Sequence, residues 1–295
     1  MALLSAPWAA AAARRLGARD RDAAVSRAAR DPLSNLFLLE LAAGLGRPAS
    51  PGEAPPELVG VFRGRELAAL VALRPCIVLE RDLGAEALQA LLPFLLEVEG
   101  GLVKSALAPV DALWRELAAH GRRALVDRRE TAWRLERRDL VAAGPAPGAR
   151  VRPAAGSDLE ALVQAARASL REEGRPDPFE GDPEGFRRWV RGRVTRASVV
   201  ETATGVAWVG YADVRRPEGW LLQGVYSFPA ERRRGHARAG VAALCREAFA
   251  AGASHVQLAV VEGNTAAERL YQGLGFRPFD VLRTILFEPG GGHGA

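Results

Sequence analysis

The chain has 295 residues, 48% of them hydrophobic, and a formal net charge of +5 with a sequence pI of about 9.9. That length and apolar content allow a sizeable core and more than one domain. The basic residues are almost all arginine, with Lys104 as the sole lysine, which indicates a GC-rich genome. No RNA-reading aromatic pattern accompanies these arginines, so the positive charge does not point to nucleic acid or a membrane as partner.

The first half of the chain is expected to alternate helices and strands. Residues 1–13 are alanine-rich but lack the charged start and long apolar core of a signal peptide, and no span reaches transmembrane length, so we expect a cytoplasmic protein. Apolar spacing and turn residues predict these elements: helices over 31–44, 85–98 and 109–120, strands over 58–63, 67–79, 101–108 and 124–135, and a Pro-rich loop over 46–57.

A segment rich in Pro, Gly and Ala, 141–149, predicts a linker. We therefore expect an N-terminal α/β domain over 1–143 and a C-terminal domain over 150–288. The tail, 289–295, has too few packing groups to be ordered.

The second half is expected to begin with two helices. Ser157 with Glu160 predicts a capping box for the first helix, which stops near Gly174, and Asp182 begins the second helix. Three strand-like runs follow and predict an antiparallel meander: 197–201, 206–214 and 220–228.

The segment 224–237, GVYSFPAERRRGHA, has the layout of a strand, a phosphate-binding loop and a helix start. Its spacing is R-x-x-G-x-A, from Arg232 through Gly235 to Ala237. Small residues at a helix start let unpaired N–H groups approach an anion, and the helix dipole adds roughly half a positive charge there. The segment therefore predicts a diphosphate site, with an ordinary surface loop as the alternative.

A strand over 255–261 and a helix over 264–274 come next. The helix carries N-x-x-A-x-x-L-Y-x-x-L-G-F, from Asn264 to Phe276. The two motifs, in this order and with a helix and a strand between them, resemble the acetyl-CoA-binding segment of the GNAT superfamily of N-acetyltransferases. The resemblance implies a GNAT fold of mixed α/β class, with acetyl-CoA as co-substrate and no metal.

The resemblance also implies how the coenzyme binds. Pantetheine would pair with the main chain of an edge strand, and the diphosphate with backbone N–H groups at the helix start. The residues expected to bind the coenzyme are Val225, Tyr226, Ser227, Arg232, Arg233, Arg234, Gly235, His236, Ala237, Arg238 and Asn264. Asn264 has a second interpretation as a turn residue, beside a predicted capping box of Thr265 and Glu268.

Tyr271 is the expected catalytic residue. Helix spacing alone favours a core tyrosine, whereas the resemblance implies that its hydroxyl points at the sulfur of coenzyme A and assists the departing thiolate. Full proton transfer from a phenol to a thiolate is uphill by about 2 kcal/mol, so we expect a hydrogen bond that strengthens as the sulfur gains charge.

The strand before the phosphate loop offers no carboxylate as a base, because it carries only Gln223 and Gly224 among apolar residues. At pH 7 a lysine-like amine costs about 4.6 kcal/mol to deprotonate and an α-amine little more than about 1, so a weakly basic amine is the easier acceptor. The acidic loop over 171–182 suits a cationic acceptor or plain solvation. Four acids could act through a water or be surface acids: Glu172, Glu173, Asp213 and Glu262.

The first half echoes the element order of the second, but RDLGAEALQ stands where the phosphate loop should be, and no Asn and Tyr pair follows. We interpret it as a degenerate GNAT-like domain that supports the other, with an unrelated α/β domain as the alternative. The layout resembles bacterial proteins in which an uncharacterised domain precedes a GNAT domain.

The expected function is transfer of an acyl group from acetyl-CoA directly to a primary amine of a small molecule or a peptide N-terminus. The alternative is a non-catalytic acetyl-CoA sensor, which the missing base favours. Cys76 and Cys245 are expected to be inert core residues, the four histidines show no metal-ligand spacing, and homodimerisation stays open.

Overall fold

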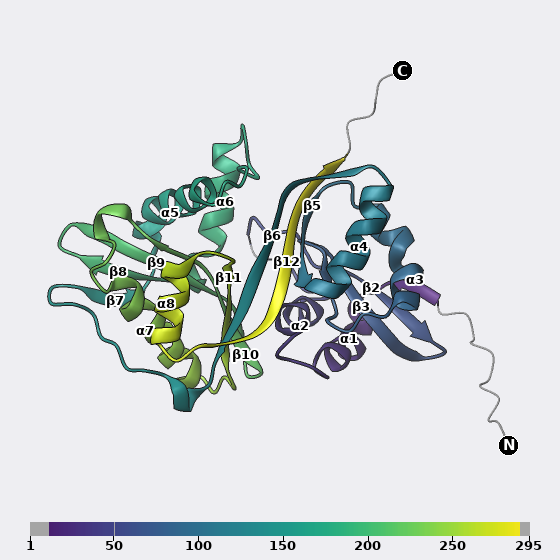
Figure 1. The fold of residues 1–295 in the computed structure, drawn as a ribbon, viewed down its shortest axis with the longest axis horizontal. Helices are drawn as coiled ribbons and strands as arrows, with labels where there is room; N and C mark the ends of the chain where they lie inside the picture. Colours follow the sequence, from purple (N-terminus) through teal and green to yellow (C-terminus); the bar gives the residue numbers. More distant parts are fainter. Residues whose placement is uncertain (1–11, 50, 290–295) are drawn as a thin grey trace. The chain divides into compact units, whose positions relative to one another are not determined.

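The computed structural model describes residues 12–49 and 51–289, which fall into two compact units (Figure 1). The first unit comprises Met1–Pro48, Pro55–Asp127 and Arg283–Ala295, and the second comprises Ala49–Ala54 and Arg128–Leu282. Two long strands, β6 (Arg122–Leu135) and β12 (Arg277–Pro289), contribute their two ends to different units. The expected domain limits, 1–143 and 150–288, stay a prediction.

The first unit packs helices on both faces of a sheet ordered β1-β2-β3-β4. The helices α1 and α2 share one apolar cluster with the sheet, and α3 and α4 share another. Its elements are β1 (Ala12–Arg15), α1 (Arg21–Ala28), α2 (Leu36–Ala43), β2 (Glu57–Arg63), β3 (Glu66–Arg74), β4 (Val78–Leu79), α3 (Ala85–Leu96), β5 (Gly101–Ala106) and α4 (Leu107–Ala119).

The second unit has the same layering, with α7 and α8 on one face of the sheet and α5 and α6 on the other. Its strands lie in the order β7-β8-β9-β10-β11-β6. Its elements are β7 (Arg150–Pro153), α5 (Leu159–Glu172), α6 (Pro183–Gly192), β8 (Ala197–Thr202), β9 (Gly205–Arg216), β10 (Gly219–Ser227), α7 (His236–Ala250), β11 (Val256–Val261) and α8 (Thr265–Gly273).

The order of elements in the first half recurs in the second: strand, two helices, three strands, helix, strand, helix and strand. A matching ion pair supports the duplication. Arg14 donates two hydrogen bonds to Asp20, and Arg152 donates two to Asp158, which lies the same distance along the sequence. The expected mixed α/β fold, with a degenerate copy in the first half, is confirmed.

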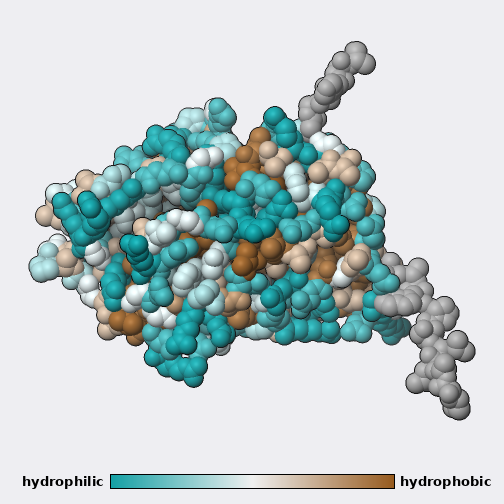
Figure 2. Space-filling model, in the orientation of Figure 1, coloured by the Kyte–Doolittle hydropathy of each residue, from teal (hydrophilic) through white to brown (hydrophobic). Residues whose placement is uncertain are grey.

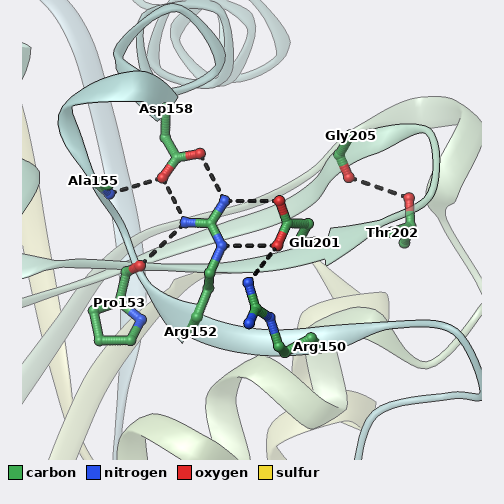
Figure 3. A network of polar contacts seen from close by, with 8 residues as sticks. All are labelled: Arg150, Arg152, Pro153, Ala155, Asp158, Glu201, Thr202 and Gly205. Carbon is green, nitrogen blue, oxygen red and sulfur yellow. Dashed lines mark hydrogen bonds and ion pairs between the residues drawn. The ribbon is translucent and has the colours of Figure 1, made fainter.

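Figure 3 shows how this pair fixes the start of α5. Arg152 in β7 holds both oxygens of Asp158, which also accepts the backbone N–H of Ala155 at 2.8 Å. On its other side Arg152 donates to Glu201 of β8 at 2.9 and 3.1 Å. One guanidinium therefore joins two strands and a helix start, which uses its planar fork of donors fully.

Most helices and strands lie where the sequence predicts them, and the differences have local causes. The first predicted helix starts at Leu36 and not at residue 31, and the predicted strand over 67–79 is two strands separated at Pro75. Four elements were not predicted from the sequence: β1, α1, β7 and β12.

The two predicted capping boxes are wrong in detail. Asp158 and not Ser157 precedes α5, and Asn264 caps α8 by accepting the backbone N–H of Ala267 at 3.2 Å. Asp182 does cap α6, by accepting from the backbone N–H of Gly185 at 2.7 Å. Of the predicted tail, Pro289 ends β12 and the rest lies outside the described residues.

None of the helices in the described ranges has the length and apolar content needed to cross a membrane. On the face drawn in Figure 2 hydrophilic side chains dominate, and hydrophobic atoms form smaller separate groups.

Candidate functional site

Strands β10 and β11 separate after a short parallel contact in the second unit. Their register pairs are Trp220 with Val256 and Leu221 with Gln257, although both strands continue beyond these residues. A bulge interrupts β10 on its other side, where the pairing with β9 shifts register and Gly224 has a φ of 56°. Beyond Leu221, within the described ranges, the edge of β10 that faces β11 has no strand partner, so a ligand can add to it by backbone hydrogen bonds.

The loop after β10 presents a run of free backbone donors at the start of α7. Arg233 has a φ of 62° and Gly235 a φ of 82°, and these left-handed residues turn the chain sharply into the helix. The first N–H of this region to bond within the helix is that of Ala239, to the carbonyl of Gly235 at 3.0 Å. Among described residues, the N–H groups of residues 233–238 find no acceptor, and unpaired donors at a helix start are a geometry that favours an anion.

His236, the first residue of α7, turns its side chain inward. The residue is 5% exposed, and its Nε2 lies 3.4 Å from Oε2 of Glu231. Its Nδ1 is buried and has no hydrogen-bond partner in the described part of the chain. Gly235 and Ala237 flank it with no bulky side chain, so the backbone at the helix start stays accessible.

The four arginines of the expected diphosphate site differ in what they contact. Arg232 binds both oxygens of Glu172 at 2.7 and 2.8 Å and lies over the Tyr226 ring at 5.6 Å, and Arg234 pairs with Glu231 at 3.1 Å. Arg233 and Arg238 make no ion pair with any described residue. These two are therefore the arginines available to an anionic ligand without breaking a contact.

Glu172, the last residue of α5, connects that helix to the end of β10. The Tyr226 hydroxyl donates to its Oε1 at 2.9 Å, and the other two β10 residues expected to bind the coenzyme, Val225 and Ser227, are half-buried. Partial burial raises the pKa of Glu172, but the hydrogen bonds from Arg232 and Tyr226 outweigh it and leave the pKa below its usual value. Glu172 is thus an anion held by two donors and not a free base.

Tyr271 lies on α8 in the apolar cluster shared with α7 and β11. It is 5% exposed, its ring packs edge-on against Phe276 at 5.6 Å, and its hydroxyl bonds to no residue in the described ranges. Burial, and secondarily Cys245, raises its pKa above the usual value of a phenol. The phenol is therefore a protonated donor whose hydrogen bond is available to a ligand.

Three of the four acids considered as bases have cationic partners, and Glu172, paired with Arg232, is one of them. Glu173 pairs with Arg128 at 2.9 Å, and Asp213 is ion-paired with Arg193. Glu262 alone of the four is exposed without an ion pair to any described residue. The negative charge of the 171–182 loop is also compensated in part, because Asp177 lies 3.8 Å from Arg167. The loop therefore gives little evidence that the acceptor is strongly cationic.

Sequence reasoning missed a buried carboxylate beside β11, Glu130. It is 2% exposed, lies opposite Val261 at the end of β11, and pairs with Arg128 at 3.2 Å. It was missed because β6 begins in the first unit and reaches β11 only through nonlocal pairing. The segment around Glu130 is rich in arginine, so its local sequence gave no signal of burial.

Neither cysteine is a candidate nucleophile. Cys76 is half-buried, and burial raises the pKa of its thiol to about 12. Cys245 is buried on α7, and burial raises its pKa as well. In the described ranges no group of three His, Cys, Asp or Glu side chains is placed to hold a metal ion.

Comparison with known proteins agrees with this geometry. Residues 159–276 match the model of the acetyltransferase (GNAT) family. A comparison with curated protein sequences gives no significant match.

Solved structures resemble nearly the whole chain. A Drosophila protein is 16% identical with a TM-score of 0.71, over 94% of this chain and 98% of its own. A GCN5-related N-acetyltransferase from Sphaerobacter thermophilus is 20% identical with a TM-score of 0.59, over 96% and 97%. A tandem GNAT protein from the clavulanic acid biosynthesis pathway is 16% identical with a TM-score of 0.56, over 96% and 100%.

At these identities the structures establish the fold, which extends through both halves, while the family match covers the segment that holds the separated strands and the phosphate loop. Residues 159–276, in the second half of the chain, therefore match the acetyltransferase (GNAT) family, and both halves share the fold of the solved GNAT structures.

Proposed function

We propose that the second unit binds acetyl-CoA and transfers its acyl group directly to a primary amine. The observation that carries this proposal is the run of backbone N–H groups over residues 233–238, which find no acceptor in the described ranges, beside a strand edge that has no strand partner there. A diphosphate and an amide-rich pantetheine arm are the ligand parts that such donors fit.

The chain offers a contact for each part of the co-substrate. The main chain of Val225, Tyr226 and Ser227 would hold the pantetheine amides. The diphosphate would lie against the N–H groups of the α7 start, with Arg233 and Arg238 as unpaired cations and Arg232 and Arg234 at the edge of the site. Ala237 leaves room for this approach, and His236 and Asn264 are the residues whose side chains could add contacts from either side.

Bound acetyl-CoA supplies an acyl group activated as a thioester. Backbone donors of the β10 bulge would polarise the thioester carbonyl, and the Tyr271 hydroxyl would donate a hydrogen bond to the leaving sulfur. Because Tyr271 is buried and its pKa is raised, it keeps its proton throughout the working pH range.

The acceptor is best sought among weakly basic amines. Of the acids considered as bases, Glu172, Glu173 and Asp213 are engaged by arginines, and an engaged carboxylate is a weaker base. An α-amine costs little more than about 1 kcal/mol to deprotonate at pH 7, so it needs the least help. A small molecule or a peptide N-terminus would supply such a group.

A binding-only role is the second candidate, and the same engaged acids favour it. Isothermal titration with acetyl-CoA, followed by a thiol-release assay across α-amines and lysine-like amines, separates the two. Binding with thiol release supports the transferase. Binding without release from any amine supports the sensor, and absence of binding overturns both.

A matched pair of variants tests the site itself. Gly235 has open space where a side chain would extend, and Asp and Asn tolerate its left-handed φ better than other residues do. Gly235→Asp places a carboxylate among the free N–H groups and should weaken acetyl-CoA binding more than about tenfold relative to Gly235→Asn, which has the same shape and no charge. Equal binding by the two variants would show that the diphosphate lies elsewhere.

A further inference from the structure

The guanidinium of Arg193 lies over two aromatic rings, those of Trp189 and Tyr211, on the face of the second unit that carries α5 and α6. We call these three residues the clamp. The guanidinium carbon of Arg193 lies 4.7 Å from the centre of the Trp189 ring and 4.5 Å from that of Tyr211. Its side chain is 13% exposed and is ion-paired with Asp213, which is 7% exposed. A guanidinium that lies over two rings and also pairs with a buried carboxylate has little freedom left.

The Tyr211 ring in turn supports the bulge of β10. Tyr211 is paired in register with Gln223, the residue before the bulge. A Cβ added to Gly224 would lie 2.9 Å from Cδ2 of Tyr211, so the backbone of the bulge rests directly on the ring. Gly224 is left-handed at this point, and any shift of the ring would let the bulge relax.

The opposite end of the clamp is braced by residues 51–54, which join the second unit from the first half of the sequence. Glu53 pairs with Arg196, whose guanidinium also lies 3.8 Å from Oδ1 of Asp213. A Cβ added to Gly52 would lie 2.9 Å from Cα of Trp189, so this segment packs closely on α6. The contacts are continuous from this segment to the bulge.

We propose that Arg193 is a positioning residue for the acyl transfer. By holding the Tyr211 ring under Gly224 it fixes the β10 bulge, and thereby the direction of the backbone donors that polarise the thioester. This inference rests on the proposed function. The diphosphate contacts lie beyond the bulge at the start of α7, and only the pantetheine contacts adjoin it, so we expect the clamp to act more on the transfer step than on coenzyme affinity.

The test uses Arg193→Gln and Arg193→Lys in the full chain, with Arg187→Gln as control. Arg187 is also an α6 arginine paired with a carboxylate, Glu160 of α5, but it touches neither ring of the clamp. Both Arg193 variants should lower kcat by more than about tenfold, because small displacements of reacting groups are costly, while their Kd for acetyl-CoA stays within about threefold. Arg187→Gln should leave both quantities unchanged.

The lysine variant separates positioning from charge. Lysine keeps an ion pair with Asp213 but lacks the flat face that stacks on Tyr211. A wild-type kcat in Arg193→Lys would contradict the proposed positioning role of Arg193. An equal loss of kcat and of coenzyme affinity in Arg193→Gln would contradict it as well.

Hydrogen exchange of the segment 220–228 decides the inference independently of activity. Exchange there should be faster in both Arg193 variants than in the wild type or in Arg187→Gln, because the bulge loses its support. Unchanged exchange would refute the clamp even in an active enzyme. If the wild type releases no thiol from any amine, the proposed function fails, and the exchange result still accepts or rejects the role of Arg193.

Discussion

Tyr271 combines a buried ring with a hydroxyl that bonds to no described residue, and the two features have different consequences. The ring packs against Phe276 and belongs to the core, so removing it would damage the fold. The hydroxyl bonds to no described residue, so it contributes nothing visible to the fold and its hydrogen bond is available to a ligand.

Tyr271→Phe should therefore lower activity without lowering stability. The ring contact with Phe276 is kept, so the thermal midpoint should not fall, while kcat in the thiol-release assay should drop by about tenfold or more. The Kd for acetyl-CoA from titration should change little. A variant with wild-type kcat would assign Tyr271 to packing alone.

The pH profile checks the same group in the unaltered protein. Burial raises the pKa of Tyr271, so the donating, protonated form persists above pH 10. Activity should therefore show no alkaline loss from this group up to about pH 10. An alkaline limb below that pH which disappears in Tyr271→Phe would contradict the raised pKa.

Glu172 holds Arg232 with both carboxylate oxygens, and so competes with an anionic ligand for that arginine. Glu172→Gln should tighten acetyl-CoA binding severalfold, because the released guanidinium becomes available to the diphosphate. Because the pKa of Glu172 is lowered, its carboxylate is charged throughout pH 6 to 8. The difference in acetyl-CoA affinity between Glu172→Gln and the wild type should therefore be constant over this range. Isothermal titration measures the Kd for acetyl-CoA, with Glu160→Gln on the same helix as control. Weaker binding in Glu172→Gln would contradict the view that Glu172 competes with the ligand for Arg232.

At the scale of elements, the start of α5 depends on one arginine. Arg152→Met leaves Asp158, whose side chain is 7% exposed, without its cation and should cost roughly 2–4 kcal/mol. Arg14→Met removes the corresponding pair of the first unit, where the arginine is 42% exposed, and should cost less. Urea unfolding followed by circular dichroism measures both, and an equal or larger loss for Arg14→Met would contradict the ranking.

The same pair predicts a pH dependence. The hydrogen bonds from Arg152 lower the pKa of Asp158 below its usual value of about 4. The stability that this shift contributes is present above that value and is lost as the pH falls through the lower pKa of the folded state. The difference between wild type and Arg152→Met should therefore shrink on going from pH 7 to pH 2.5.

Elements with strong local signals were predictable, and those defined by distant partners were not. The meander β8 to β10, the helix α7 and the strand β11 follow from apolar periodicity and turn residues, and the helix start at Gly235 follows from the small residues there. The short strand β7 and the shared strand β12 have weak patterns of their own and depend on pairing with other parts of the chain.

The candidate site divides in the same way. The N–H groups at the α7 start and the position of Tyr271 were predictable because one short motif carries each. The engagement of Arg232 by Glu172, the buried Glu130, and the stack of Arg193 on Tyr211 were not, because each joins residues from separate elements. Nothing in the local sequence specifies such a contact.

At the scale of the molecule, duplication raises the question of whether both units bind a coenzyme. In the first unit β4 and β5 meet as β10 and β11 do, with Ile77 bridging Val103 in parallel. Beyond this bridge, however, the Leu79 N–H donates to the buried Ser105 hydroxyl at 2.7 Å. The backbone donor that would face a pantetheine arm is therefore already satisfied.

The α3 start of the first unit is also unsuited to a diphosphate. A cavity of about 380 Å³ lies there, and acids contribute to its wall, including Glu80, Asp82 and Glu86. Glu80 is 3% exposed and accepts hydrogen bonds from Nε and Nη2 of Arg27, so this edge of the guanidinium is not available to a ligand. Fixed negative charge beside the helix start repels an anion that the dipole alone would attract.

The whole chain should accordingly bind one acetyl-CoA. Isothermal titration should give a stoichiometry near one per chain, and Gly235→Asp should weaken this binding more than about tenfold and leave no site of wild-type affinity. A stoichiometry near two, or one intact site in Gly235→Asp, would mean that the first unit binds the coenzyme despite Ser105 and its acids. In that case Ser105→Val, which removes the hydroxyl acceptor at nearly constant burial, should change only the residual site, because Ser105 makes its contacts within the first unit.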